Sequence, residues 1–176
     1  MGRTLPRGSA ERLAQAWIAL VLAAGCGALV VGVIALTDPR WRAELQSPTF
    51  WIFLIAASVA HAFPVIAPRH QAYHATQAFL MAAVLLLSWP SVCTIVVVTH
   101  ITEWLRRRRP WYIQLYNVAV YLLSAAAAEG VLQLLDARPF VLADGAAVIA
   151  ALAAAAAYLL VNHGLTAVVL RLARGV

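Results

Sequence analysis

Two ionisable side chains, His100 and Glu103, lie three residues apart in an otherwise apolar stretch. A spacing of three places both side chains on one face of a helix. Imidazole nitrogens and carboxylate oxygens are ligands for divalent metal ions, and a histidine also changes its charge near neutral pH. The pair could therefore form part of a metal site or of a proton-sensitive switch. The structural alternative is a set of hydrogen bonds that only holds helices together.

Four more polar residues interrupt apolar segments, namely His61, Asn117, Asn162 and His163. Polar and ionisable groups inside a membrane are costly, and they are functional candidates by default. We expect all six residues to lie at a similar depth and at least three to converge. His61 or His163 could then complete a metal site, or the group could form a proton-sensitive switch. These six are the candidate ligand-sensing or proton-sensing residues. No metal motif of specific spacing accompanies them, so the sequence does not assign a metal.

The composition around these residues indicates a membrane protein. Of the 176 residues 64% are hydrophobic and only 11% are charged, and the mean hydropathy is +0.84. A soluble domain has about 25% charged residues, so this chain is too apolar to cover its surface with polar groups. We therefore expect an all-α, polytopic membrane bundle.

Six apolar segments, bounded by proline, tryptophan or charged residues, are candidates for membrane spans of about 20 residues each. They cover approximately residues 14–37, 49–66, 71–88, 91–105, 111–135 and 144–172. Trp89 and Pro90 predict a turn between the third and fourth segments, for which a re-entrant hairpin is the alternative. We expect a cytoplasmic segment at residues 1–13, followed by a six-helix transmembrane domain at residues 14–176.

The basic residues are all arginines, and their distribution predicts the orientation in the membrane. Six spans place ten of them on one side: Arg3, Arg7, Arg12, Arg69, Arg106, Arg107, Arg108, Arg109, Arg171 and Arg174. The other side holds Arg40, Arg42 and Arg138, offset by Asp38, Glu44, Asp136 and Asp144. The positive-inside rule then places both termini in the cytoplasm. We expect the block 106–109 to bind anionic lipid headgroups, and no nucleic acid to be bound.

Small residues recur every fourth position in the first segment, as Ala24, Ala28 and Gly32, and as Ala19, Ala23 and Gly27. Such stripes allow helices to approach closely in lipid. We expect Gly27 and Gly32 to lie at helix contacts. The stripe through Ala24, Ala28 and Gly32 is also a candidate contact with a membrane protein partner or with a second copy of the chain.

Motifs of common enzymes are absent from the sequence. It contains no GxSxG, P-loop, HExxH or CxxC pattern, each of which arranges a specific catalytic or ligand-binding group. Cys26 and Cys93 both fall inside apolar runs, which is typical of unpaired buried thiols. We therefore expect no enzymatic activity and no cofactor.

Two stretches of the second half resemble a known class of membrane region. The matching features are Arg109-Pro110-Trp111-Tyr112, Tyr116-Asn117 and the run from Tyr158 to Asn162. They are similar to the N-terminal multi-helix membrane regions of bacterial signalling proteins, which in that family precede GGDEF or HD-type phosphohydrolase domains. The resemblance implies a sensory, input or anchoring module in a bacterial inner membrane, here without the output domain.

Two other functions fit the same pattern of helices. The number of helices, the chain length and the stripe Ala19, Ala23 and Gly27 also resemble the substrate-binding components of energy-coupling vitamin transporters. In such a component the stripe would pack against a partner membrane subunit. The third candidate is an accessory subunit of a membrane complex. An outward-facing cavity of ligand size would favour transport, whereas a filled interior would favour the accessory subunit.

Overall fold

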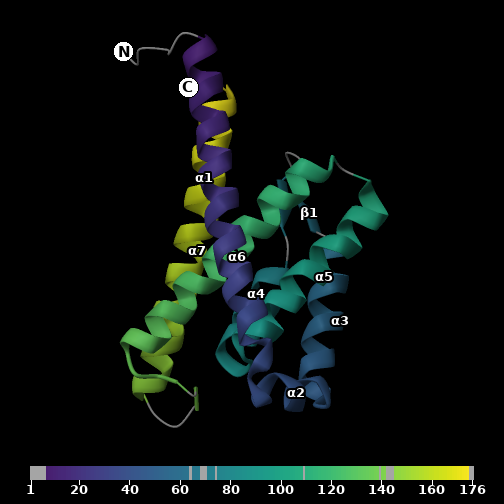
Figure 1. The fold of residues 1–176 in the computed structure, drawn as a ribbon, viewed down its shortest axis with the longest axis vertical. Helices are drawn as coiled ribbons and strands as arrows, with labels where there is room; N and C mark the ends of the chain where they lie inside the picture. The colour runs from purple at the N-terminus through teal and green to yellow at the C-terminus, as the bar shows by residue number, and fades with distance from the viewer. Residues whose placement is uncertain are drawn as a thin grey trace.

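The computed structural model describes residues 7–63, 65–67, 71–73, 75–108, 110–138, 140–141 and 145–174. Its elements are, in order, α1 (Arg7–Ile34), the short 3-10 helix η1 (Ala35–Thr37), α2 (Pro39–Leu45), α3 (Pro48–Ala62), β1 (Val65–Ala67), β2 (Gln71–Tyr73), α4 (Thr76–Leu86), α5 (Trp89–Arg107), α6 (Trp111–Leu134) and α7 (Gly145–Arg174). The strands β1 and β2 form a short antiparallel pair. The rest is helical (Figure 1), so the expected helical fold class is confirmed.

Each of the six expected apolar segments contains one of the helices α1, α3, α4, α5, α6 and α7. The expected break at Trp89 and Pro90 is confirmed, because α4 ends at Leu86 and α5 begins at Trp89. Proline suits the first turn of a helix, since it lacks the amide hydrogen that would remain unbonded there. Helix α1 begins at Arg7, earlier than the expected boundary at residue 14.

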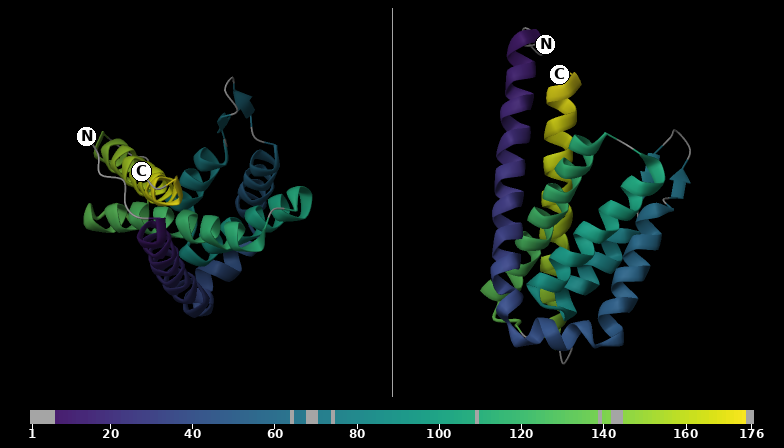
Figure 2. Two further views of the ribbon diagram at one scale, coloured as in Figure 1. Left: turned by 90° about the horizontal axis from the view of Figure 1, so that it is seen from above. Right: turned by 45° about the vertical axis from the view of Figure 1, so that its right-hand side comes forward.

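The helices run alternately up and down, and the two described ends of the chain lie at the same end of the molecule (Figure 2). Helix α2 crosses the opposite end, and the turn between α5 and α6 lies in the half that carries the termini. The start of α1 and the ends of α5 and α7 therefore lie in one half of the molecule. In the sequence these helix ends carry Arg12, Arg106 to Arg108 and Arg171. The expectations for Arg3, Arg69, Arg109 and Asp144 lie outside the described residues.

Three helical stretches in the described part of the chain are long and apolar enough to cross a membrane: Glu11–Thr37, Trp111–Leu134 and Gly145–Ala173. A fourth span results if the bent pair Pro39–Leu45 and Pro48–Ala62, which turns by 72°, is counted as one. Helix α4 has 11 residues, which gives about 16 Å at 1.5 Å per residue. That length is about half of a 30 Å hydrocarbon core. These helices suggest a membrane protein, with up to four spans by length and composition.

The core lies between α3, α4, α5, α6 and α7. Its largest fully buried apolar side chains are Phe50, Leu80, Ile95, Leu122 and Tyr158. Helix α6 also packs on its other side against α1, where Val21 lies with Tyr116, Ala119 and Val120. Because α6 contacts both groups of helices, it connects α1 and α7 to the α3–α5 pair.

Glycines allow α1 to approach its neighbours closely, although only one of the two expected positions does so. Gly32 is buried, and a Cβ atom there would lie 2.7 Å from Cys93 Sγ. The expectation for Gly27 was wrong, since a Cβ there would meet nothing within 4 Å. Gly25 takes that role instead, with Ala119 Cα only 2.7 Å from such an atom.

The two small-residue stripes of α1 differ in exposure. Ala19, Ala23 and Gly27 are all exposed. In the other stripe Ala24 is exposed and Ala28 is half-buried, with its carbonyl accepting a 3.1 Å hydrogen bond from Trp89 Nε1, while Gly32 is buried against α5. A contact of either stripe with a partner protein or a second copy stays a prediction.

Charged side chains stabilise helix ends at the end of the molecule opposite the termini. Glu44 accepts hydrogen bonds from the backbone amide of Ser88 at 2.9 Å and from the hydroxyls of Ser88 and Ser91, so its negative charge lies at the start of α5. A carboxylate at a helix N-terminus is favourable because the amides there are unbonded and the dipole is positive. Arg138 donates to the carbonyls of Val84 and Leu85 near the end of α4.

Candidate functional site

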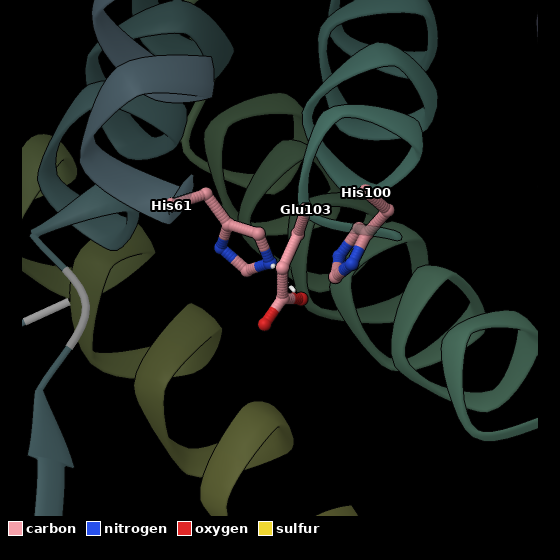
Figure 3. Close-up of side chains that lie close together, drawn as sticks. All are labelled: His61, His100 and Glu103. Atoms are coloured by element: carbon pink, nitrogen blue, oxygen red, sulfur yellow. Dashed lines mark ion pairs between the residues drawn. The ribbon is translucent and has the colours of Figure 1, made fainter. Parts of the chain in front are cut away.

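His61, His100 and Glu103 come together between α3 and α5 (Figure 3). His61 is the last but one residue of α3, while His100 and Glu103 lie one turn apart on α5. His61 Nε2 lies 3.0 Å from Glu103 Oε2. The three residues are only 2–3% exposed, so an acidic group and two imidazoles share an interior that water hardly reaches.

The other ring nitrogen of His61 faces α4. His61 Nδ1 lies 3.2 Å from Thr76 Oγ1, and Thr76 is fully buried. The hydroxyl can donate or accept, so this contact suits either tautomer of the ring. It holds the imidazole in an orientation that directs Nε2 towards Glu103.

Helix α6 supplies the main partner of Glu103. Gln114 Nε2 donates to Glu103 Oε2 at 3.1 Å and to the His100 backbone carbonyl at 3.3 Å. Asn117 extends this contact, because its amide donates to Gln114 Oε1 at 3.3 Å. On the other side, Arg107 Nε lies 3.8 Å from Glu103 Oε1. The carboxylate is thus held by groups from α3, α5 and α6.

Three rings pack edge to face around the same point. The centroids of His61 and His100 lie 4.5 Å apart, and those of His100 and Tyr121 lie 4.8 Å apart. Such edge-to-face pairs are the preferred geometry of aromatic rings. Tyr121, from α6, therefore limits the rotation of both imidazoles.

The remaining candidates divide between the interior and the surface. Asn117 joins the cluster through Gln114, as described above. Asn162 is buried on α7 and accepts a 3.1 Å hydrogen bond from Gln77, which in turn bonds to the Tyr121 side chain. His163, however, is exposed and does not join the cluster. The expectation that it could complete a metal site was wrong, because one residue along a helix turns the side chain by about 100°.

Sequence reasoning missed the residues that hold the cluster in place, namely Thr76, Gln77, Gln114 and Tyr121. The spacing of polar residues could have indicated Gln114, because it lies three residues before Asn117 and therefore on the same helix face. Thr76 and Tyr121 are common types in apolar helices, so nothing in the sequence distinguishes them from other buried residues.

The arginine block does not form one uniform surface. Arg106 donates to the Ala62 carbonyl at the end of α3, and its guanidinium carbon lies 4.1 Å from the centre of the Phe63 ring. Arg107 lies towards Glu103. Arg108 is exposed and has a left-handed backbone, with φ of 51°, at the end of α5. Among the described arginines of the block, Arg108 therefore has the fewest protein contacts. Its guanidinium lies near the Trp104 ring.

The donor atoms of His61, His100 and Glu103 all lie within 4.8 Å of one another. Two imidazoles and a carboxylate can exchange protons or bind a divalent cation. An apolar cavity of about 400 Å³ lies beside the cluster, and its lining includes His100, Gln114, Trp104 and Leu29. The site thus combines a polar centre with a neighbouring apolar space.

Comparison of the chain with models of known protein families, with curated proteins and with solved structures finds no match. The case for a function therefore rests on the residues and contacts of the chain itself.

Proposed function

We propose that this protein is a non-catalytic sensory module of a bacterial signalling system, embedded in the inner membrane. The observation that supports it best is the contact of 3.0 Å between His61 on α3 and Glu103 on α5. Both side chains are almost completely buried. A ligand that changes the charge at this contact changes how strongly the two helices attract each other.

The energetic scale applies when His61 is protonated, since only then is its contact with Glu103 an ion pair. Removing one partner of a buried ion pair typically destabilises a protein by about 3–5 kcal/mol, because the other charge remains in a medium of low polarity. Full inversion of a two-state equilibrium from 1:99 to 99:1 takes about 5.5 kcal/mol, so loss of this contact would shift the two populations strongly without inverting them completely. An event at this cluster can therefore change the relative populations of two arrangements of α3 and α5.

A chain of contacts leads from the cluster to the last helix. The Tyr121 ring packs on His61 and His100, and Tyr121 bonds to Gln77, which donates to Asn162 on α7. In the signalling proteins that the sequence resembles, the output domain follows the last membrane helix. A movement of the cluster would thus reach the helix from which such proteins transmit a signal.

The proposed topology has six spans with both termini in the cytoplasm. It is supported by the alternating direction of the helices and by the arginines in the half that carries the termini (Figure 2). In this arrangement α4 and α5 would cross together with their neighbours, despite the shortness of α4. Arg108 would lie at the level of anionic headgroups and bind them, whereas Arg106 and Arg107 serve contacts within the protein.

A transport function is the second candidate, and the 400 Å³ cavity offers it a ligand site, although in the proposed topology this cavity lies towards the cytoplasmic side rather than the outside. The cavity is lined by α1, α5 and α6 and is apolar apart from His100 and Gln114. A small apolar ligand with one polar group would match this lining. Such a ligand should copurify with the protein and be lost when Val97 is replaced by tryptophan, which would fill the cavity.

The sensory proposal can be tested by measuring the distance between α3 and α5. Spin labels at the exposed positions Val59 and Leu105 report it, after the exposed Cys26 has been replaced by alanine. Glu103→Gln removes the charge while keeping the shape of the side chain. We expect the distance distribution in lipid nanodiscs to shift by about 1–2 Å or more, the scale of helix movements in switching proteins.

His163→Gln is the matched control, since it removes an imidazole at an exposed position. It should leave the distance unchanged. If Glu103→Gln folds normally and also leaves the distance unchanged, the cluster does not control the packing of α3 on α5 and the sensory proposal is wrong.

A further inference from the structure

We infer that His61, His100 and Glu103 bind a divalent transition-metal ion of the zinc type, and that this ion is the ligand of the proposed sensory site. The claim that the ion is the sensory ligand rests on the proposed function. The claim that the ion binds does not, because the ion could bind without moving the helices. That claim rests on the three side chains, their separations and the residues around them.

The separations of the donor atoms suit a common metal ion. Zinc bonds of about 2.0–2.1 Å to nitrogen and 2.0–2.2 Å to oxygen, at tetrahedral angles, place two donor atoms about 3.4 Å apart. The observed distance between His61 Nε2 and Glu103 Oε2 is 3.0 Å, and all three residues offer a donor within 4.8 Å. The largest separation, up to 4.8 Å, must shorten towards about 3.4 Å before all three donors can bind one ion.

The surroundings of the cluster resemble the outer shell of a metal site. A metal-binding histidine usually holds its second ring nitrogen in a hydrogen bond, and a metal-binding carboxylate is itself hydrogen-bonded. His61 Nδ1 faces Thr76 Oγ1 at 3.2 Å, and Nε2 lies 3.0 Å from Glu103 Oε2, so the second ring nitrogen points into the cluster. Gln114 donates to Glu103 Oε2 at 3.1 Å, and Asn117 holds Gln114 in turn.

The types of the three ligands select the class of ion. Imidazole favours zinc and its transition-metal neighbours, whereas magnesium and calcium prefer sites made of oxygen ligands. The carboxylate supplies one negative charge against the two positive charges of the ion. Arg107 opposes binding, since its guanidinium lies 3.8 Å from Glu103 Oε1.

The site lies close to the ends of its helices. His61 is followed by Ala62, the last residue of α3, and Glu103 lies four residues before Arg107, the last residue of α5. One turn of helix measures about 5.4 Å, so the ion has a short path from that end of the molecule. The guanidinium carbon of Arg106 lies 4.1 Å from the centre of the Phe63 ring near that end.

The test uses a protein in which every other histidine is removed. The chain has five histidines, so His70→Gln, His74→Gln and His163→Gln leave only His61 and His100. This variant is purified through a tag without histidines, stripped with a chelator and titrated with CoCl₂ and ZnCl₂ in lipid nanodiscs. We expect one cobalt ion per chain, visible optical bands of a low-coordinate site and X-ray absorption that shows two imidazoles, with no competition from MgCl₂.

Substitution of single ligands gives the second measurement. Loss of an outer-shell partner typically weakens metal binding by about 10- to 100-fold. Loss of a direct ligand should weaken cobalt binding at least as much, and we expect this for His61→Gln, His100→Gln and Glu103→Gln. Thr76→Val should weaken it within about that range. Arg107→Gln should strengthen binding, because it removes the opposing charge.

The inference is overturned if the histidine-depleted protein fails to bind cobalt and zinc, or if it binds them no more tightly than magnesium. It is also overturned if X-ray absorption shows no imidazole on the bound metal, a result that does not depend on the folding of any single-ligand variant. The spin-label distance then separates the two proposals. Zinc that binds without changing the distance between positions 59 and 105 supports the metal site but contradicts the sensory function. If the distance responds to Glu103→Gln but no metal binds, the sensory function is supported and the metal site is contradicted.

Discussion

Gly25 of α1 lies so close to Ala119 of α6 that no other residue fits there without a shift of the backbone. A Cβ atom at position 25 would lie 2.7 Å from Ala119 Cα, a distance that real Cβ atoms essentially never show. The side chain of Ala119 is almost fully buried in the same contact. Because the neighbouring atom belongs to the main chain, it cannot rotate out of the way.

Gly25→Ala should therefore destabilise the protein by about 1–3 kcal/mol, the usual range for overpacking a tight contact. Gly27→Ala is the matched control, because it lies two residues away on the same helix and meets nothing within 4 Å. Unfolding in mixed micelles with increasing denaturing detergent measures both. Equal stability of the two variants would mean that α1 does not pack against α6 at Gly25.

Gly32 makes the equivalent contact with α5, and its nearest neighbour can be removed. A Cβ at position 32 would lie 2.7 Å from Cys93 Sγ and 3.3 Å from Cys93 Cβ. We expect Gly32→Ala to lower the thermal midpoint, and the added Cys93→Ala to restore part of the loss because it deletes the sulfur. A double-mutant cycle should give a favourable coupling of about 0.5–3 kcal/mol. Simple additivity of the two changes would argue against this contact.

Arg138 holds the end of α4 in place. It donates to the carbonyls of Val84 and Leu85 and pairs with Glu129 on α6. Arg138→Gln should lower stability by about 1.5–3 kcal/mol, the value for a hydrogen bond that involves a charged group. Arg42→Gln serves as the control, since Arg42 is exposed on α2, and it should be nearly neutral. Hydrogen exchange at residues 84–88 should increase only in the first variant.

Labelling of single cysteines tests the proposed topology. Arg42→Cys and Arg108→Cys place thiols at opposite ends of the molecule, both at exposed positions, in a background with Cys26→Ala. An impermeant maleimide added to intact cells should label position 42 but not position 108. Labelling of position 108 from outside would reverse the orientation that the arginines predict.

The sequence by itself was sufficient to predict six of the helices, but not α2 or the strands β1 and β2, whose residues 65–66 and 71–73 were expected in helical segments. Apolar runs interrupted by proline and charge define them, as at Trp89 and Pro90, because a backbone in lipid must satisfy its hydrogen bonds within the helix. It also indicated the rare polar residues, since such groups are costly in an apolar segment and easy to recognise. His61, His100 and Glu103 are therefore recognisable as candidate site residues from the sequence alone.

Only the tertiary structure decided which face of each helix packs against protein. In soluble helices a polar face identifies the solvent side, but a membrane helix is apolar all round, so its periodicity carries little of this information. Gly25 and Gly27 look alike in the sequence, as do the polar neighbours Asn162 and His163, yet in each pair one residue packs inside and the other faces outwards. The contacts of Thr76, Gln114 and Tyr121 with the cluster likewise depend on how α4 and α6 rotate against α5, and that rotation is set by packing between helices distant in the chain.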